Sequence, residues 1–384
     1  MKIVKVNSTY KRRIAIFHFA PPKIDSGGVV DSRKLIESLA DKCCSIYELL
    51  LFTNDLKLIN LLIKSNKHKA FEIYFLPIFE NPLYSFKLAL RTIISLVQIK
   101  NKLKYCLVYI SNESPTILLP LLVLLRILKA KVAFKQHSYY FIFDTESIRY
   151  IIHTLPKIYQ RLLYILLAFI YTNIVKYFKP FVVTPNNYLA LFIRKALNIN
   201  ALFIPPGNYP LTLFTSTKPH VASHICSVSS KIDVNYIRVL EVIAQYFSTS
   251  VILFGKPYGP QQLQVQQMLT NSRNITYMGL VPRERLLHDL VSTCKQAIYV
   301  ASYETWAYAL YELLATCSTV YVIFPNLNIA NSLIELYREI FKDSIKIVYK
   351  FPVAIFRLQR FDSEMLLRLQ ERYVSGFCKL FEVL

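Results

Sequence analysis

The fold is decided by the segment AIYVASYETWAYALYELLA, residues 297–315. It opens with an apolar run that predicts a buried strand ending at Ala301. A short polar loop carrying Glu304 follows, and a helical pattern begins near Trp306. A buried strand that passes through a short loop into a helix is the repeating unit of a parallel sheet covered by helices.

The same unit recurs along the whole chain in two successive sets. The first set has strand-like runs at 13–19, 45–52, 72–77, 104–111, 131–135 and 181–184, with helical patterns at 29–42, 55–65, 83–101, 115–129 and 146–178. The second set has strand-like runs at 224–228, 250–254, 275–278, 296–301, 319–324 and 344–349, with helical patterns at 233–247, 260–270, 283–294, 306–316 and 328–341. We therefore predict an α/β fold of two doubly wound, Rossmann-like domains that face each other across a cleft.

A stiff, turn-rich stretch, IPPGNYP at 204–210, suits a linker between the two domains. We expect an N-terminal domain over residues 1–205 and a C-terminal domain over residues 206–361. The segment 362–384 has the pattern of one amphipathic helix. We expect this helix to pack back across the N-terminal domain.

The composition excludes several classes of protein. The chain has 384 residues, of which 54% are hydrophobic and 18% charged, so it is a core-forming chain and not a disordered one. It has seven glycines, and they form neither a G-x-G-x-x-G dinucleotide motif nor a P-loop. The seven cysteines are scattered and mostly lie in apolar runs, which predicts reduced, buried thiols in a reducing compartment.

The positive charge is concentrated in the first half of the chain. Residues 1–200 carry 29 basic and 11 acidic side chains, a net +18, whereas residues 201–384 carry 17 and 13, a net +4. We expect neither a signal peptide nor a membrane-spanning helix, because the apolar stretches 114–125 and 162–175 fall short of the roughly 20 residues that a span needs. The segment 158–179 is apolar nearly all round with basic residues at both ends, so we expect it to contact an anionic membrane surface.

Two carboxylates in the opening segment have the spacing of a nucleotide-sugar site. Glu304 precedes the predicted helix and Glu312 lies two turns into it, which sets them about 12 Å apart, close to the span of a ribose–diphosphate–hexose unit. A carboxylate accepts two hydrogen bonds at once and therefore suits vicinal hydroxyls, and a helix N-terminus offers donors to a diphosphate. The alternative, two solvated surface acids, is disfavoured for Glu312 by its apolar neighbours Tyr311 and Leu313.

The sequence around Glu304 and Glu312 resembles a motif of a known protein family. A strand followed by S-x-E-x7-E (Ser302, Glu304 and Glu312) resembles the donor-site motif of the GT-B retaining glycosyltransferases, in particular glycosyltransferase family four (glycosyl transferases group 1). Further segments resemble the family's motifs in the same order from about residue 13 to 325. They are PPKIDSGG (21–28), KQH (135–137), VVTPNNYL (182–189), IPPG (204–207), VILFG (251–255) and YMGLVPRE (277–284).

The resemblance implies a role for each matching position. Glu312 would hold the nucleotide ribose, Glu304 would hold hydroxyls of the transferred sugar, and His137 would reach the sugar near the reacting carbon. His137 and Glu304 are thus the catalytic candidates. The candidates for binding the donor and its nucleotide are Gly27, Gly28, Lys231, Gly255, Lys256, Gly279, Leu280, Val281, Thr305, Trp306 and Glu312.

The chain also departs from the family's pattern. Thr305 and Ala307 stand where the family usually has glycines, and Asn235 stands where a phosphate-clamping lysine would be. Lys231 is the nearest cation, one residue out of register. Two alternatives therefore stay open: a non-catalytic relative that binds sugar or lipid, and a nucleotide-sugar epimerase of the same fold.

The resemblance implies transfer of a sugar from a nucleotide-diphosphate sugar to an acceptor hydroxyl. It implies that the domain at 1–205 binds the acceptor and the domain at 206–361 binds the nucleotide sugar. No Asp-x-Asp occurs, so we expect no metal and no cofactor beyond the nucleotide-sugar co-substrate.

We expect a glycan, lipid or lipid-linked acceptor and a cytoplasmic location, peripheral on the inner face of the membrane. Candidate anion contacts in the basic half are Arg12, Arg13, Lys131 and Lys135. Nucleic acid is not an expected partner, because no helix-turn-helix, zinc finger or long basic run occurs.

Overall fold

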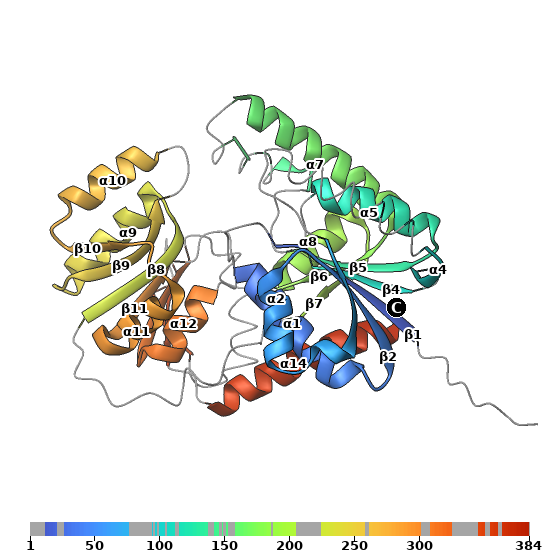
Figure 1. The fold of residues 1–384 in the computed structure, drawn as a ribbon. Coiled ribbons are helices and arrows are strands. Elements are labelled where there is room, and N and C mark those ends of the chain that lie inside the picture. The colour runs from blue at the N-terminus through green and yellow to red at the C-terminus, as the bar shows by residue number, and fades with distance from the viewer. Residues whose placement is uncertain are drawn as a thin grey trace, which may run out of the picture.

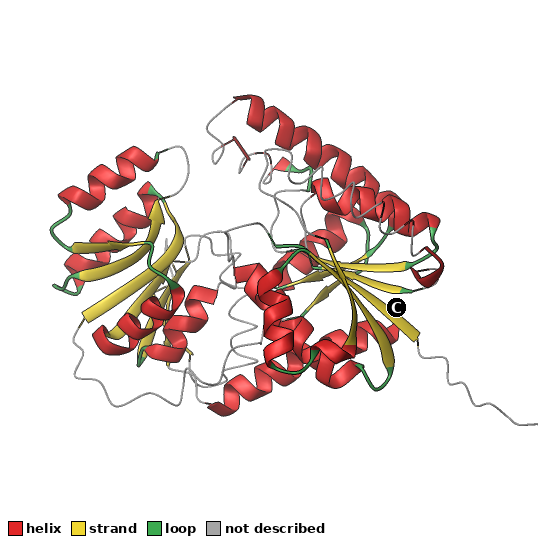
Figure 2. Cartoon of the chain, viewed as in Figure 1, coloured by secondary structure: helices red, strands yellow, loops and turns green. Residues whose placement is uncertain are grey.

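A computed structural model of the chain folds into two α/β lobes, which lie side by side in Figure 1. The structure describes residues 12–20, 27–76, 94, 97, 100–103, 106–111, 115–136, 142–145, 148, 151–152, 158–185, 187–204, 224–257, 261–300, 308–324, 345–349, 354–359 and 363–383. In both lobes the strands form a central sheet with helices around it (Figure 2).

The first lobe contains a seven-stranded, wholly parallel sheet with the strand order β3-β2-β1-β4-β5-β6-β7. Its strands are β1 (Arg12–His18), β2 (Tyr47–Thr53), β3 (Phe71–Phe75), β4 (Leu107–Ile110), β5 (Lys131–Lys135), β6 (Phe181–Thr184) and β7 (Ala201–Phe203). The helices are α1 (Gly27–Cys43), α2 (Leu56–Lys64), α4 (Lys100–Leu103), α5 (Pro115–Ile127), α7 (Ile158–Phe178) and α8 (Asn187–Leu197), with a short 3₁₀ turn at His68–Ala70.

The strands of this sheet are apolar along their length because both faces are covered. In β1, Ala15 and Phe17 belong to one core cluster and Ile14 and Ile16 to another. Successive side chains of a strand point to opposite faces, so the two clusters are the two layers of the lobe. A sheet buried on both faces needs helices on both sides, which is why strands and helices alternate along the sequence.

The second lobe repeats the architecture with the strand order β10-β9-β8-β11-β12-β14-β13. Its strands are β8 (His224–Ile232), β9 (Val251–Pro257), β10 (Ile275–Gly279), β11 (Cys294–Val300), β12 (Thr319–Phe324), β13 (Ile345–Tyr349) and β14 (Ala354–Gln359). The helices are α9 (Val234–Tyr246), α10 (Gln262–Asn271), α11 (Arg283–Thr293) and α12 (Tyr308–Thr316). Sequence patterns missed β7 and β14, and β14 runs antiparallel to both of its neighbours.

The helix α14 (Ser363–Val383) returns from the second half of the chain to the first lobe. Its residues Tyr373, Phe377 and Phe381 are buried in the same cluster as Ile14 of β1. Gly376 lies so close to β7 that a Cβ there would come within 3.1 Å of Ile204. The far end of the chain is therefore part of the core of the first lobe.

One expectation about the cysteines is wrong. Cys226 of β8 and Cys294 of β11 form a disulfide, with their Cα atoms 5.7 Å apart, so only five of the seven thiols are free. The two residues are 68 positions apart in the sequence. They meet because β8 and β11 are neighbours in the sheet, which spacing along the chain does not reveal.

The helix α7 is longer than its most apolar stretch suggested. Within the described part of the chain, α7 is a helix that is long and apolar enough to cross a bilayer. It spans 21 residues, yet only 22% of its most apolar 18-residue stretch is buried. Its inner side, formed by Ala168, Tyr171, Thr172 and Val175, packs on the first lobe.

Candidate functional site

Polar side chains gather in the first lobe where neighbouring parallel strands end. His18 ends β1, Asp55 follows β2 and Ser111 follows β4, and all three are buried. His18 Nε2 lies 3.0 Å from Asp55 Oδ2, and His18 Nδ1 lies 2.8 Å from Ser111 Oγ. The carboxyl ends of parallel strands are where ligands bind in open α/β sheets, so this polar cluster lies at the functional edge of the sheet.

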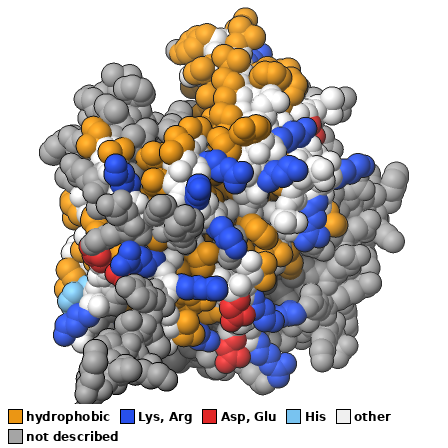
Figure 3. All heavy atoms as spheres, turned by 90° about the vertical axis from the view of Figure 1, so that its right-hand side faces the viewer, with side chains coloured by type: hydrophobic (Ala, Val, Ile, Leu, Met, Phe, Trp, Pro, Cys, Tyr) orange, Lys and Arg blue, Asp and Glu red, His pale blue; other side chains and the backbone are white. Residues whose placement is uncertain are grey.

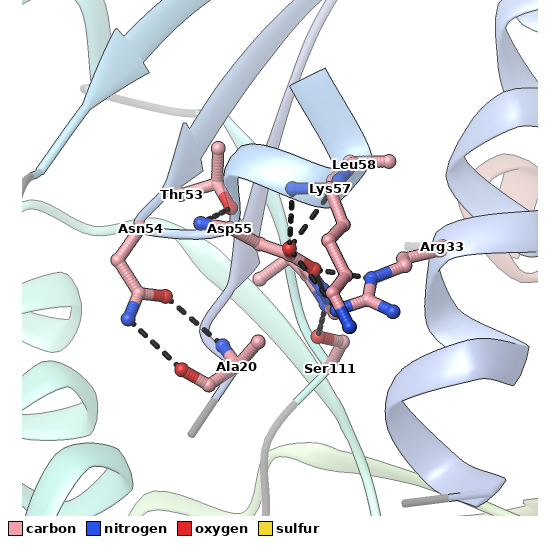
Figure 4. A network of polar contacts seen from close by, with 9 residues as sticks. Ala20, Arg33, Thr53, Asn54, Asp55, Lys57, Leu58 and Ser111 are labelled. Atoms are coloured by element: carbon pink, nitrogen blue, oxygen red, sulfur yellow. Dashed lines mark hydrogen bonds and ion pairs between the residues drawn. The ribbon is translucent and has the colours of Figure 1, made fainter. Parts of the chain in front are cut away.

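Arg33 of α1 completes the cluster (Figure 4). Its Nε and Nη2 donate to the two carboxylate oxygens of Asp55 at 2.5 and 3.1 Å, a bidentate pair. Burial by itself raises the pKa of Asp55, but the hydrogen bonds from His18 and Arg33 outweigh it and hold the pKa well below its ordinary value. Asp55 also accepts hydrogen bonds from the backbone N–H groups of Lys57 and Leu58 and thereby caps α2.

Burial lowers the pKa of His18 and so favours the neutral ring, although the neighbouring Asp55 favours the charged form. In the neutral ring Nε2–H donates to the ionised Asp55, and Nδ1 accepts from the hydroxyl of Ser111. The cluster therefore joins β1, β2, β4 and α1 through one buried carboxylate.

A second buried cluster lies at the end of β5. Lys135 forms an ion pair with Asp31 of α1, and both side chains are 1% exposed. The hydroxyl of Tyr373 donates to Asp31 Oδ2 at 2.6 Å and accepts from Lys135 Nζ at 3.3 Å. Burial lowers the pKa of Lys135 to about 7, while the adjacent carboxylate favours the charged lysine.

This pairing corrects the interpretation of Lys135 as an anion contact, because its ammonium is buried against a carboxylate of the protein. The other three basic candidates stand at the opposite ends of their strands. Arg12 and Arg13 begin β1, with Arg13 paired to Glu48 at 2.6 Å, and Lys131 begins β5. Arg12, Arg13 and Lys131 therefore lie away from the carboxyl-end edge of the sheet, whereas Lys135 lies at that edge but is paired within the protein.

Side-chain contacts hold the residues on both sides of the segment 21–26, which precedes the glycine pair. Before it, the backbone N–H of Ala20 donates to Asn54 Oδ1 at 2.9 Å, and Asn54 Nδ2 donates to the carbonyl oxygen of Ala20 at 2.9 Å. After it, α1 begins at Gly27, and its residues Asp31 and Arg33 are fixed by the two clusters. Residues 21–26 lie outside the described part, but both of their attachment points are held by side-chain hydrogen bonds.

In the second lobe, two predicted glycines occupy backbone conformations that suit only glycine. Gly255 in β9 has φ +143°, and a Cβ there would overlap the carbonyl oxygen of Ser229 in β8. Gly279 ends β10 with φ +75° and has open space where its Cβ would be. Tyr277 Oη donates to the carbonyl oxygen of Gly255 at 2.9 Å, so the two strand ends are tied together.

The residues that follow these glycines are accessible. Leu280 is 73% exposed, Val281 is partly exposed and Lys256 is exposed. Their backbone and side-chain groups are open to a ligand, which is compatible with the roles that the resemblance assigned.

Glu312 is buried, with 6% of its surface exposed, between the buried Leu313 and Leu310 of α12. This excludes the interpretation of Glu312 as a solvated surface acid. A carboxylate is seldom placed inside a lobe without polar partners, because removing its charge from water is costly. Glu312 has an interaction partner, so it is not an isolated buried charge.

Four predicted site residues, His137, Glu304, Thr305 and Trp306, lie outside the described residues. Lys231 belongs to β8, but its side chain is also outside the described part. The structure thus brings together Gly255 and Gly279 on neighbouring strands and leaves Gly27 and Gly28 at the start of α1 in the other lobe. The roles of all these residues stay predictions.

Sequence analysis missed His18, Asp31, Arg33, Asp55 and Tyr373. A signal for two of them was present, because His18 and Asp55 each stand at or just after the carboxyl end of an apolar strand. For Asp31, Arg33 and Tyr373 no such signal exists, since their partners come from other elements of the fold.

Comparisons with known proteins give a likeness in structure only. No protein-family profile matches the chain, and no curated protein matches it. Among solved structures, a glycosyltransferase from Rickettsia africae ESF-5 aligns with a TM-score of 0.54 over 97% of this chain and 98% of its own, at 13% identity. The chain has a GT-B fold. Family four in particular has no support from these matches beyond the motifs.

Two other GT-B structures align over nearly the whole chain. One is from E. coli, described as trehalose-6-phosphate bound with UDP-2-fluoro glucose, with a TM-score of 0.52, 10% identity and 96% of both chains covered. The other is WaaG, a glycosyltransferase involved in lipopolysaccharide biosynthesis, with a TM-score of 0.50, 11% identity and 94% of both chains covered. At these identities the likeness establishes the GT-B fold, and with it the expected α/β class of two doubly wound domains.

Proposed function

We propose that this protein is a glycosyltransferase that moves a sugar from a nucleotide-diphosphate sugar to a hydroxyl of an acceptor. The observation that carries the proposal is the buried Glu312 on α12 of a GT-B fold, eight residues after Glu304 in the motif that resembles the family's donor site. A buried carboxylate in the nucleotide half suits the vicinal hydroxyls of a ribose, because it can accept both hydrogen bonds at once.

The proposed donor site uses the ends of the strands in the second lobe. Gly279, Leu280 and Val281 offer backbone groups to the base, and their exposure supports this role. Gly255 of β9 lies so close to Ser229 of β8 that no side chain fits at this position. Lys256 and Lys231 are the cations available to a diphosphate, with Thr305 and Trp306 following Glu304. We propose that amides and these cations, with no metal, stabilise the leaving diphosphate, and that the configuration of the sugar is retained.

The first lobe is proposed to hold the acceptor and to complete the site around the reacting carbon with His137. The clusters around Asp55 and Lys135 support this role, because they fix α1, which starts with Gly27, and the end of β5, which precedes His137 by two positions. These clusters do not react with substrate. They position the two segments that would.

We further propose a lipid or lipid-linked acceptor and a cytoplasmic location, peripheral on the inner face of the membrane. The excess of 29 basic over 11 acidic side chains in residues 1–200 supports an anionic surface as partner of the first lobe. The involvement of WaaG in lipopolysaccharide biosynthesis is compatible with a lipid acceptor on this fold.

The test is turnover of a panel of sugar nucleotides by the wild-type chain and by Glu312→Gln. We expect the wild type to release nucleoside diphosphate from at least one donor. We expect Glu312→Gln to lose about 100-fold in rate, the effect of about 3 kcal/mol from a charged hydrogen bond. Glu241→Gln, on the partly exposed side of α9 in the same lobe, is the matched control and should keep full activity. Full activity of Glu312→Gln at an unchanged melting temperature would contradict the site assignment.

The second candidate is a sugar-nucleotide-binding relative without transferase activity, or an epimerase of the same fold. The departures motivate the binding protein, because Asn235 lacks the charge of the expected lysine, and Thr305 and Ala307 carry side chains where glycines would let amides approach the phosphates. Calorimetric binding of a sugar nucleotide without release of nucleoside diphosphate would favour the binding protein. Conversion of the sugar nucleotide to its epimer in the absence of any acceptor would favour the epimerase.

A further inference from the structure

The outer side of α7 is an exposed apolar face. Eight of its side chains are between 37% and 79% exposed and recur at helical spacing. They are Ile158, Tyr159, Leu162, Leu163, Leu166, Phe169, Ile170 and Tyr177. Phe143 extends the face, since its ring packs edge-on against Phe169 with centroids 5.4 Å apart and is itself 41% exposed. An apolar surface of this size on a water-soluble protein marks an interaction site.

The charged residues of α7 itself have one sign. α7 contains no acidic residue, and its basic residues are Arg161 and Lys176. In Figure 3 hydrophobic side chains form a crest along the top, where Figure 1 places α7, with Lys and Arg side chains spread below them. An apolar face bordered by cations fits the boundary between the acyl chains and the headgroups of an anionic bilayer.

A pocket of about 220 Å³ lies at the C-terminal end of the same helix. Phe178 of α7 and Leu122 of α5 are among its apolar walls, and three cations, Arg126, Lys131 and Lys179, contribute to its lining. No acidic residue is among the described lining residues. Apolar walls with three cations suit the phosphate of a lipid headgroup together with the start of its acyl chains.

We propose that α7 docks the protein on an anionic lipid bilayer, with the helix lying in the interface and Arg126, Lys131 and Lys179 contacting lipid phosphates. This proposal rests on the proposed function and deepens it. It brings the lobe that is proposed to hold the acceptor to the surface where a lipid acceptor is found. A bilayer fits better than a second copy of the chain. A twofold interface around this pocket would bring cations of both copies close to one another, which opposes association.

The experiment is co-sedimentation of the full chain with vesicles of phosphatidylcholine, with or without about one third phosphatidylglycerol. We expect at least tenfold tighter binding to the anionic vesicles, and a loss of this preference at high salt. The double variant Leu162→Gln/Leu166→Gln should weaken binding to anionic vesicles at least tenfold. The double variant Arg126→Gln/Lys179→Gln should remove most of the preference for anionic lipid.

The controls change equally exposed residues of the second lobe. Val242→Gln/Leu263→Gln and Arg238→Gln/Arg273→Gln should bind vesicles as the wild type does. Equal binding to both vesicle types, or full binding by the α7 variants, would overturn the proposal. So would a stable dimer in light scattering that the α7 variants convert to a monomer.

The outcome is separable from the test of the glycosyltransferase assignment. Vesicle binding is measured without a sugar nucleotide, and donor turnover is measured without vesicles. Turnover without vesicle binding removes only the docking surface. Vesicle binding without turnover of any donor removes only the transferase assignment.

Discussion

The hydroxyl of Tyr373 donates a hydrogen bond to Asp31 at 2.6 Å, across 342 positions of the sequence. It is the point where the last helix of the chain meets the first. Asp31 in turn pairs with Lys135, so α14, α1 and the end of β5 share one buried carboxylate. The positions of α1 and of the end of β5 therefore depend on a helix from the far end of the chain.

Removing this hydroxyl should loosen that attachment. We expect Tyr373→Phe to lower the free energy of unfolding by about 1 to 3 kcal/mol, because a buried carboxylate loses a donor. Urea unfolding measures the change. Tyr177→Phe, at a side chain that is 79% exposed, is the control and should be neutral. Equal stability of Tyr373→Phe and the wild type would show that Asp31 does not need the hydroxyl of Tyr373.

The two glycines of the second lobe should differ in their tolerance of a methyl group. Gly255→Ala forces a Cβ onto the carbonyl oxygen of Ser229, so we expect a loss of about 3 kcal/mol, the upper end for forced overpacking. Gly279→Ala meets open space, and its positive φ alone should cost about 1 to 2 kcal/mol. Thermal unfolding of both variants checks the order, and a reversed order would contradict the register of β8 and β9.

The cluster around Asp55 should make stability fall at acid pH in two steps. The folded pKa of His18 is lowered, so below its unfolded value near 6.5 the unfolded chain binds a proton that the folded chain does not, and stability falls. The pKa of Asp55 is also lowered, so its contribution is present above its unfolded value near 3.8 and is lost as the pH falls further.

Chemical unfolding between about pH 7 and pH 3 measures both steps. We expect His18→Gln to flatten the curve between about pH 7 and pH 5, since its side chain does not titrate. Asp55→Asn should cost about 3 to 5 kcal/mol near neutral pH, because it breaks a buried ion pair with Arg33. A His18→Gln curve that follows the wild type at every pH would mean that other groups control the acid loss.

The number of free thiols can be measured directly. Denaturation without a reductant should leave five thiols for alkylation, and prior reduction should expose all seven. Peptide mass spectrometry should join the segments that carry Cys226 and Cys294. Seven alkylated thiols without reduction would restore the sequence-based expectation of fully reduced cysteines.

The alternation of apolar strands and helical patterns was enough to predict both lobes. A strand such as β1 is buried on both faces over residues 14–17, so this run is wholly apolar and stands out from the helices beside it. The strands β7 and β14 escaped because β7 has three residues, and because β14 follows β13 without a helical pattern between them. Short or antiparallel strands lack the spacing on which that prediction depended.

The residues of the candidate site also divide into those that could be recognised from the sequence and those that could not. The glycines at 255 and 279 could be recognised from sequence, because a glycine at the end of an apolar strand is a local pattern. Glu312 could also be singled out, since it is the one acid on an apolar helix, and its burial agrees with that interpretation. The partners of Asp31 and Asp55 could not be recognised, because each pair joins residues from different elements.

The order of residues along the chain determined the α/β class, the two-lobe arrangement and the concentration of positive charge in the first half. Each of these follows from local composition and periodicity. Only the tertiary structure decided that Lys135 pairs with Asp31 and that Cys226 is joined to Cys294. These contacts are set by how distant segments pack, and no local pattern encodes them.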